Sequence, residues 1–302
     1  MNTRTQGGPV QGATIFVMSI ACLSGVLGGT QAVATRFALP EIAPLTLAIV
    51  RFGIASACII PIALIWGRVR ISGRDFAASV ALGVMFFGLF PYLFAAAFQY
   101  ATAARGALVL GAMPVVTLFL ARALGSETLS RGKLIGAMVT LFGVIVVVGQ
   151  NAFAGDATNP EAWKGDALLL VGVVIGAVFN VGSKPVLSRV PTLAFCAIIM
   201  TSGFLAMAMA GFFFGAYEVS LDLPNDVWAA ILFLGTLGGF FPIILWNYAL
   251  ARVTPAQSSV AVALNPVTAT AGGVLLLSEP LGVSLVLGLI LVLTGVVLSA
   301  KG

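Results

Sequence analysis

Arg51 is the residue whose type and position most directly suggest chemistry. It lies within the sequence APLTLAIVRFGIASACII (residues 43–60), which is dominated by apolar residues. A buried charge is costly unless another group compensates it. An anionic group of a bound molecule, such as a carboxylate, could be that partner, because no acidic residue is expected at the same depth. The alternative is a structural role, in which the side chain caps backbone carbonyls or extends to a polar boundary.

A second set of candidates consists of amides, aromatic residues and hydroxyls within similar apolar runs. Amides can hydrogen-bond both an ammonium and a carboxylate, and aromatic rings suit an apolar side chain or a cation. As a set they predict a polar cavity, although any single member could instead tie two helices together for ~0.6 kcal/mol. The candidates are Tyr92, Gln99, Tyr100, Asn180, Trp246, Asn247, Tyr248 and Asn265, with Ser24 and Gln31 as weaker members.

The composition identifies the environment of these residues. Of 302 residues, 60% are hydrophobic and 8% are charged, and the mean hydropathy is +1.11. Soluble domains carry about a quarter charged residues, so lipid must be the solvent. The apolar runs have the length of membrane-spanning helices, about 20 residues. We predict an all-α integral membrane protein with ten transmembrane helices at 13–37, 42–66, 76–98, 104–124, 132–150, 165–184, 192–215, 227–248, 255–277 and 281–299.

Lys and Arg are distributed unevenly among the predicted loops. If the N-terminus is cytoplasmic, eleven of the fifteen lie inside, three lie outside and Arg51 lies within a helix. This asymmetry follows the positive-inside rule. We therefore expect both termini in the cytoplasm, a cytoplasmic tail at 1–12 and an external linker at 151–164. The net charge of +5 then concerns topology and anionic lipid, and it does not indicate nucleic-acid binding.

The chain also contains an internal repeat. Its markers in the first half recur 152 positions later: Pro114, Glu127, Gly136 and Gly143 match Pro266, Glu279, Gly288 and Gly295. The repeat predicts two five-helix units, at 13–150 and 165–302. Because five is odd, the two copies enter the membrane with opposite orientations. Inverted repeats of this kind are typical of transporters, whose substrate site lies near the midplane between the repeats.

Two further features recur in both units. Prolines fall inside predicted helices, where each removes a backbone hydrogen bond and can kink its helix; they are Pro91, Pro114, Pro242 and Pro266. The kinks could serve as bending points for alternating access or could simply shape the bundle. Ser-Glu pairs stand where one helix ends and the next begins, at Ser126-Glu127 and Ser278-Glu279. We expect each pair to cap the helix that follows it.

Two five-helix halves that each end in Pro-x12-Glu-x8-Gly-x6-Gly resemble the paired EamA-type units of the drug/metabolite transporter superfamily. The resemblance covers nearly the whole chain. It implies a bacterial inner-membrane exporter of amino acids or related metabolites, similar to the aromatic-amino-acid and paraquat exporter type, with 151–164 in the periplasm. It also implies a central cavity lined mainly by the first, third, fourth, sixth, eighth and ninth helices. Since the second helix is not among them, the structural role of Arg51 is the favoured one.

Absent residue types restrict the alternatives. The sequence has no histidine, and its first predicted helix has no Asp or Glu. A proton-coupled multidrug or cation exporter would be expected to use a buried carboxylate, and a phosphorylated-metabolite antiporter would need more than one deep cation. No Walker loop, His-metal cluster or nucleophile elbow suggests an enzyme. We expect facilitated or exchange transport with no metal or organic cofactor. The expected partners are a small-molecule substrate and the lipid bilayer, and a monomer is compatible with the sequence.

Overall fold

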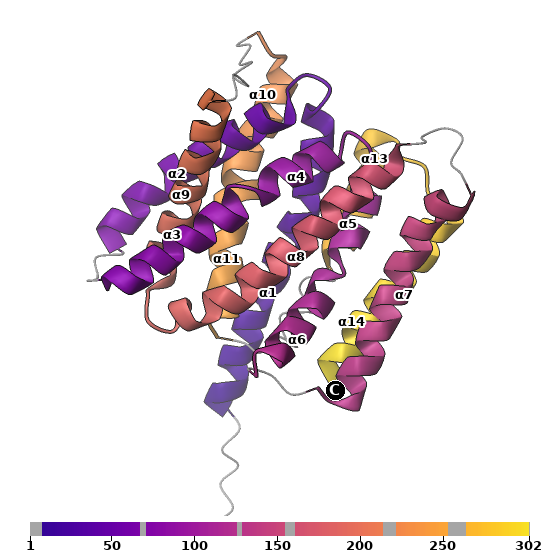
Figure 1. Cartoon of the computed structure of the whole chain (residues 1–302), viewed down its shortest axis with the longest axis horizontal. Coiled ribbons are helices and arrows are strands. Elements are labelled where there is room, and N and C mark those ends of the chain that lie inside the picture. Colours follow the sequence, from indigo (N-terminus) through magenta and orange to yellow (C-terminus); the bar gives the residue numbers. More distant parts are fainter. Residues whose placement is uncertain are drawn as a thin grey trace, which may run out of the picture.

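The structure is a computed structural model that describes residues 8–66, 71–125, 129–154, 161–213, 222–252 and 264–301. These residues form helices, one π-helical turn and their connections, without a β-strand, and the helices pack as a bundle (Figure 1). In chain order the elements are α1 (Gly8–Ala38), α2 (Pro44–Trp66), α3 (Gly73–Phe87), α4 (Phe90–Ala97), α5 (Ala103–Leu110), α6 (Met113–Ala123), α7 (Arg131–Ala154), α8 (Ala162–Leu187), α9 (Thr192–Phe213), α10 (Asn225–Gly235), η1 (Thr236–Phe240), α11 (Phe241–Leu250), α13 (Leu264–Leu277) and α14 (Val283–Lys301).

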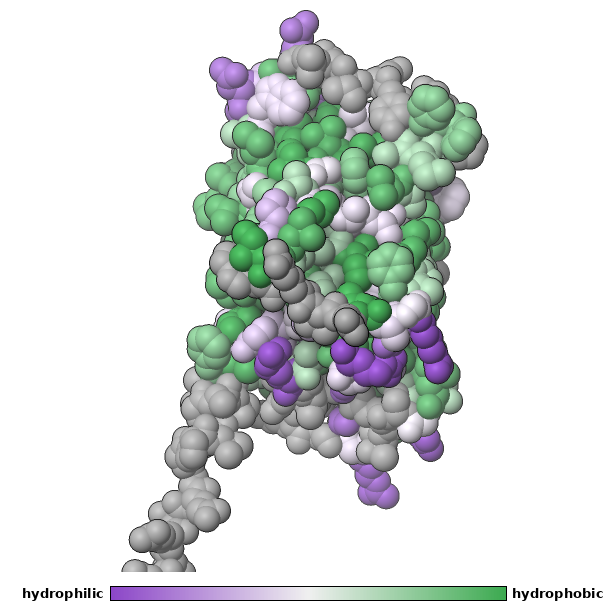
Figure 2. Space-filling view, turned by 90° about the vertical axis from the view of Figure 1, so that its left-hand side faces the viewer, coloured by the Kyte–Doolittle hydropathy of each residue, from purple (hydrophilic) through white to green (hydrophobic). Residues whose placement is uncertain are grey.

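The lengths and surface of these helices confirm an all-α membrane fold. Within the described ranges, eight helical stretches are long and apolar enough to span a membrane, and two shorter apolar helices follow at Leu264–Leu277 and Val283–Ser299. Large apolar side chains remain exposed along them, such as Phe142 and Ile145 on α7. On the face shown in Figure 2, hydrophobic residues cover the middle, and hydrophilic residues gather at the two ends. Such a band matches the hydrocarbon core of a bilayer.

Three of the predicted spans are interrupted just before a proline. The span expected at 76–98 divides into α3 and α4, and the span expected at 104–124 divides into α5 and α6. Pro91 and Pro114 each fall in the first turn of the second segment, as does Pro242 in α11, which follows the π-helical turn η1. The first turn is where a proline costs least, because its missing N–H has no intrahelical partner there. Pro266 likewise lies near the start of α13.

The last helices of the two repeats, α7 and α14, pack against each other along most of their length (Figure 1). The repeated glycines form this contact. A Cβ added to Gly136 would lie 2.5 Å from the Gly295 carbonyl oxygen, and one added to Gly143 would lie 3.0 Å from that of Gly288. Any side chain at these positions would push the backbones apart, so the repeat markers are residues that allow close helix packing.

Helices of the two halves interleave in the rest of the bundle. Helix α1 packs mainly on α13, α11 and α10, all from the second half, while α8 packs on α4, α5 and α6 from the first half. The two largest buried clusters therefore combine residues of both halves, such as Phe98 with Leu169 and Phe52 with Phe195. Any site at the centre of the bundle is built by both repeats.

Helix boundaries differ from the sequence expectation at several positions. Helix α1 begins at Gly8, inside the stretch 1–12 that was expected to be a tail, and α7 continues to Ala154, inside the expected linker 151–164. The apolar run marks the part of a helix that lies in lipid, whereas backbone hydrogen bonding continues into the polar flank. The first part of the span expected at 255–277, as far as residue 263, lies outside the described residues, as does the Ser126-Glu127 pair.

Candidate functional site

Predicted site residues of α1 and of three other helices meet along one face of α1. Ser24, Gly28 and Gln31 are spaced by four and three positions, so they lie on the same side of the helix. Each contacts a different neighbouring segment: Ser24 contacts α11, Gly28 contacts α13 and Gln31 contacts α2. We call these three residues the α1 stripe. It is the place where α1, α2, α11 and α13 come together.

Arg51 and Gln31 form the most unusual contact of the α1 stripe. The Arg51 Nη2 group donates a hydrogen bond of 2.6 Å to Gln31 Oε1, and only 5% of the Arg51 surface is exposed. The guanidinium also lies 5.0 Å from the ring centroid of Phe52. The Arg51 Nε atom is buried and has no hydrogen-bond partner. Arg51 is therefore a buried cation whose hydrogen-bonding capacity is only partly used.

Asn265 lies against Gly28, which is about one turn before Gln31 on α1. A Cβ added to Gly28 would be 2.6 Å from Asn265 Oδ1, so the glycine makes room for this amide. The Oδ1 atom is buried and accepts no hydrogen bond. The neighbouring Thr268 hydroxyl lies 3.2 Å from the Val26 carbonyl oxygen, which ties α13 to α1. The α1 stripe thus has an unused donor near Gln31 and an unused acceptor near Gly28.

Ser24 connects the α1 stripe to a predicted hinge. Its hydroxyl donates a hydrogen bond of 2.9 Å to the carbonyl oxygen of Pro242, at the start of α11. Both groups belong to the predicted sets, although no direct contact between them was expected. The bond ties α1 to the first turn of α11.

Helix α11 carries three further candidates. Asn247 is 1% exposed, and its Nδ2 donates to the Ile243 carbonyl oxygen at 2.9 Å, while its Oδ1 has no partner. Trp246 and Tyr248 pack in a small cluster with Val17 near the start of α1. The Tyr248 ring is also covered by Arg252, whose guanidinium carbon lies 3.6 Å from the ring centroid. Trp246 and Tyr248 therefore contact α1 closer to its beginning than the α1 stripe does.

The remaining candidates do not join this group. Tyr92 on α4 is 40% exposed, and Gln99 is exposed in the turn after α4. Tyr100 follows in the same turn, with Lys164 5.7 Å from its ring centroid. Asn180 is partly buried on α8, which packs mainly on α3, α4, α5 and α6 and is not among the main neighbours of α1. The structure therefore brings together Ser24, Gln31, Arg51 and Asn265, and it leaves the α4 and α8 candidates apart from them.

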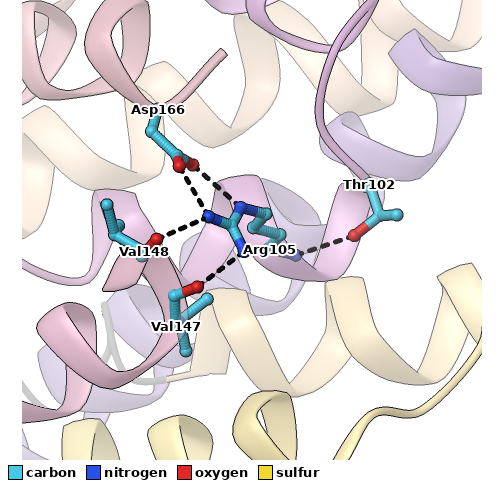
Figure 3. Close-up of polar contacts among 5 residues, drawn as sticks. All are labelled: Thr102, Arg105, Val147, Val148 and Asp166. Carbon is cyan, nitrogen blue, oxygen red and sulfur yellow. Dashed lines mark hydrogen bonds and ion pairs between the residues drawn. The ribbon is translucent and has the colours of Figure 1, made fainter. Parts of the chain in front are cut away.

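A buried ion pair joins the two repeats at one end of the bundle, which we call the Arg105 end. Arg105 lies in the first turn of α5, and its Nε and Nη2 atoms donate to the two carboxylate oxygens of Asp166 on α8, at 2.9 and 2.6 Å (Figure 3). Its other donors reach the carbonyl oxygens of Val147 and Val148 on α7, at 2.6 and 3.3 Å. Only 11% of the Arg105 side chain and 4% of the Asp166 side chain are exposed. Bidentate, charge-assisted bonds of this kind fix three helices in one geometry.

Glu279 is also at the Arg105 end, and it caps a helix other than the expected one. Its carboxylate oxygens accept hydrogen bonds from the backbone amides of Ala103 and Ala104, at 2.9 and 3.4 Å. These amides begin α5, and the Thr102 hydroxyl accepts the next one, from Arg105, at 3.2 Å. Glu279 therefore supplies the negative charge that a helix N-terminus favours. The helix is α5 of the first repeat instead of the following helix α14.

Ser278 does not cap α14 either. It is exposed, and its backbone has a φ of +53°, in the left-handed region that often ends a helix. The turn it makes directs Glu279 back toward α13, where the Glu279 amide donates to the Gly273 carbonyl oxygen at 3.0 Å. The expected cap was wrong for Ser278 because α14 begins only at Val283, five residues later.

A second ion pair joins the repeats at the opposite end, which we call the Asp75 end. Asp75 lies in the first turn of α3, and its Oδ1 atom is 2.7 Å from Nη2 of Arg189, just after α8. The Arg189 side chain is 52% exposed. The Asp75 side chain is 11% exposed, so the pair is open to solvent mainly through its arginine, where water weakens the interaction. The two ends of the bundle are thus held by ion pairs of very different burial.

The sequence reasoning did not identify Arg105, Asp166 or the true partner of Glu279. Arg105 was counted only as one of the three cations expected outside, and Asp166 was not singled out. A usable signal was present, because Asp166 falls in the first turn of a predicted helix and Arg105 near the matching end of another. Pairing them required the packing of α5 on α8, which a single sequence does not reveal.

A bundle of apolar helices with proline breaks in both repeats, matching glycine contacts and a polar stripe where the repeats meet is the architecture of a membrane transporter with internal repeats. The EamA-like transporter family matches this chain twice, over residues 15–149 and 163–301. The chain belongs to this family, which places it in the drug/metabolite transporter superfamily.

Comparison with individual proteins supports the same conclusion. The chain is 25% identical over 277 residues to an uncharacterized transporter of Archaeoglobus fulgidus, covering 92% of this chain and 96% of that protein. It is 25% identical over 166 residues to a probable terminal-alkyne amino-acid exporter of Streptantibioticus cattleyicolor, covering 54% and 52% of the two chains. A solved crystal structure of a protein with 21% identity superposes with a TM-score of 0.70 over 95% of this chain, which shows the shared fold.

Proposed function

We propose that this transporter exports amino acids or closely related small metabolites across the bacterial inner membrane. The observation that carries the proposal is the α1 stripe, where the Arg51 guanidinium and the Asn265 side-chain oxygen lie buried with unused hydrogen-bonding capacity at the junction of both repeats. Buried polar groups without partners are costly in lipid and mark functional sites. Amino acids carry the complementary charges, and one distant relative is named as an amino-acid exporter.

Alternating access is the proposed mechanism. The breaks before Pro91, Pro114 and Pro242 divide helices in both repeats into shorter rigid segments. Segments joined by a break can tilt with little loss of backbone hydrogen bonding. The breaks therefore support rocking of one repeat against the other around the α1 stripe, with units at 13–150 and 165–302. Transport of this kind needs no catalytic chemistry, so we propose no enzymatic activity.

The orientation is part of the proposal. Most Lys and Arg residues flank the Asp75 end, and the positive-inside rule therefore assigns this end to the cytoplasm. The start of α1 and the C-terminal end of the chain both lie at this end of the bundle (Figure 1), so both termini would be cytoplasmic. The Arg105 end, with its buried ion pair, would then face the periplasm.

Uptake of labelled compounds into proteoliposomes tests this proposal. The panel is phenylalanine, threonine, methionine, lysine, glutamate and a cationic dye, each with and without a pH gradient. The proposal predicts amino-acid flux that does not require the gradient and that falls when Asn247 or Gln31 is replaced by alanine. Flux of the dye alone, and only with a gradient, would show a proton-coupled multidrug exporter instead.

A further inference from the structure

The two buried arginines of this protein differ in how their charge is compensated. Arg105 has both oxygens of Asp166 and two backbone carbonyls as acceptors. Arg51 is at least as deeply buried, but within the described residues its one hydrogen-bond acceptor is the neutral Gln31. A buried guanidinium that lacks a carboxylate is strongly unfavourable, because no opposite charge offsets its loss of hydration. The cost of burying the Arg51 charge is therefore offset only if another molecule supplies an anionic group.

The structure also argues against the structural roles expected for Arg51 from sequence. A side chain that extends to the membrane boundary would expose its head group, yet Arg51 is 5% exposed. A side chain that caps a helix would donate to backbone carbonyls, yet the described part of the chain offers it a side-chain amide instead. The backbone of α10 approaches the backbone of α2 at Gly235. A Cβ added to Gly235 would lie 3.2 Å from the Arg51 carbonyl oxygen. Arg51 is therefore fixed at the junction of α1, α2 and α10.

We propose that Arg51 binds the carboxylate of the transported molecule, with Gln31 as the residue that positions the guanidinium. The unpartnered Nε–H and the hydrogens of the guanidinium not bonded to Gln31 are a planar set of donors that matches two carboxylate oxygens. Gln31 accepts one hydrogen bond without neutralising the charge, so it orients the arginine and leaves it available to an anion. The inference rests on the proposed transport function and names the chemical class of its substrate.

The α1 stripe also provides a place for an ammonium group. Asn265 Oδ1 is buried, has no donor and lies against Gly28, three residues from Gln31 and thus ~4.5 Å along the helix axis. An α-amino acid with its carboxylate at Arg51 would direct its ammonium toward this oxygen. Because both groups are buried, the molecule reaches them only when the helices around α1 separate, as alternating access requires.

Competition in proteoliposomes tests the assignment. The labelled substrate is the amino acid of the panel that is taken up fastest. Its uptake is measured in the presence of increasing concentrations of the same unlabelled amino acid, or of its primary amide, which lacks the anionic carboxylate. We expect wild-type protein to prefer the acid over the amide by ~10-fold or more, as a charge-assisted hydrogen bond requires. In Arg51→Gln this preference should disappear, while the matched control Arg122→Gln, at an exposed arginine of α6, should keep it.

Two further variants keep the test decisive if Arg51→Gln does not fold. Gln31→Glu places a carboxylate within reach of the guanidinium, so it should compete with the substrate and weaken acid binding while the protein stays folded. Arg51→Lys should retain part of the preference, because it keeps the charge but loses the planar donor set. An unchanged acid-over-amide preference in folded Arg51→Gln or Gln31→Glu would overturn this inference and leave amino-acid transport standing. No flux of any amino acid through wild-type protein would overturn the proposed function itself.

Discussion

Glu279 and the Ala103 amide are 176 positions apart in the chain and 2.9 Å apart in space. This bond joins the second repeat to the first, because Glu279 follows α13 and Ala103 begins α5. With Thr102 it satisfies the first three amides of α5 through side chains. A short helix such as α5, with eight residues, depends on such capping because it has few hydrogen bonds of its own.

Replacing Glu279 should therefore destabilise the contact between the repeats. We expect Glu279→Ala to lower the free energy of unfolding by about 1–2 kcal/mol, as for the loss of an N-cap. Glu279→Gln should cost less, because the amide oxygen can still accept one of the two bonds. Thermal unfolding in detergent measures both, with Ser278→Ala as a neighbouring control at an exposed position. Equal stability of Glu279→Ala and wild type would contradict the capping role.

The Arg105–Asp166 pair should show strong coupling. Either Arg105→Met or Asp166→Leu leaves a buried charge alone and should cost about 3–5 kcal/mol, whereas the double variant should cost much less than the sum. The Asp75–Arg189 pair supplies the control: because its arginine side chain is 52% exposed, Arg189→Gln should destabilise the protein much less than Arg105→Met or Asp166→Leu. A double-mutant cycle on unfolding free energies makes the comparison, and additive single effects would show that the pair is not coupled.

Close packing of α1 on α13 makes Gly29 intolerant of a side chain. An added Cβ would lie 2.4 Å from the Asn265 carbonyl oxygen, which is backbone and cannot move aside easily. We expect Gly29→Ala to destabilise the protein by about 1–3 kcal/mol. Gly73 at the start of α3 is the matched control, because an added Cβ there meets no atom within 4 Å. A Gly29→Ala variant as stable as Gly73→Ala would mean that the two helices can separate freely.

The break before Pro242 should matter for the rate of transport more than for binding. In Pro242→Ala the backbone can extend a regular helix through the π-helical turn, which would stiffen the segment that contacts Ser24. We expect the maximal rate of flux to fall several-fold with little change in the substrate concentration for half-maximal flux. Pro224→Ala, just before α10, is the control outside a helix interior. A change in half-maximal concentration alone would assign Pro242 to binding and not to movement.

The sequence was sufficient for the fold because the hydropathy of long helices and the spacing of the repeat are local or periodic signals. The markers Gly143 and Gly288 were found as a pattern, and the structure shows that they contact each other across α7 and α14. The partner of Glu279 could not be found in this way. A glutamate before a helix predicts a cap, but the choice of α5 over α14 is made by tertiary packing of the two repeats.

The residues of the candidate site could be predicted from the sequence, but the contacts between them could not. Arg51, Gln31, Ser24 and Asn265 were all singled out as polar residues in apolar helices. Their assembly around α1 depends on which face of each helix points toward its neighbours. The sequence of a weakly amphipathic membrane helix does not reveal that face. Tyr92 and Asn180 met the same sequence criterion, yet they lie on α4 and α8, which are not among the main neighbours of α1. Their roles in substrate binding stay predictions.

The central claim, a carrier of amino acids that alternates around the α1 stripe, is tested most directly by counterflow. Proteoliposomes are loaded with an unlabelled amino acid of the panel and diluted into a trace of the labelled compound, without a pH gradient. The account predicts transient accumulation of the label above its external concentration, because one site is exposed to each side in turn. Equilibration without overshoot would indicate a channel, and no entry of any labelled amino acid would contradict the account.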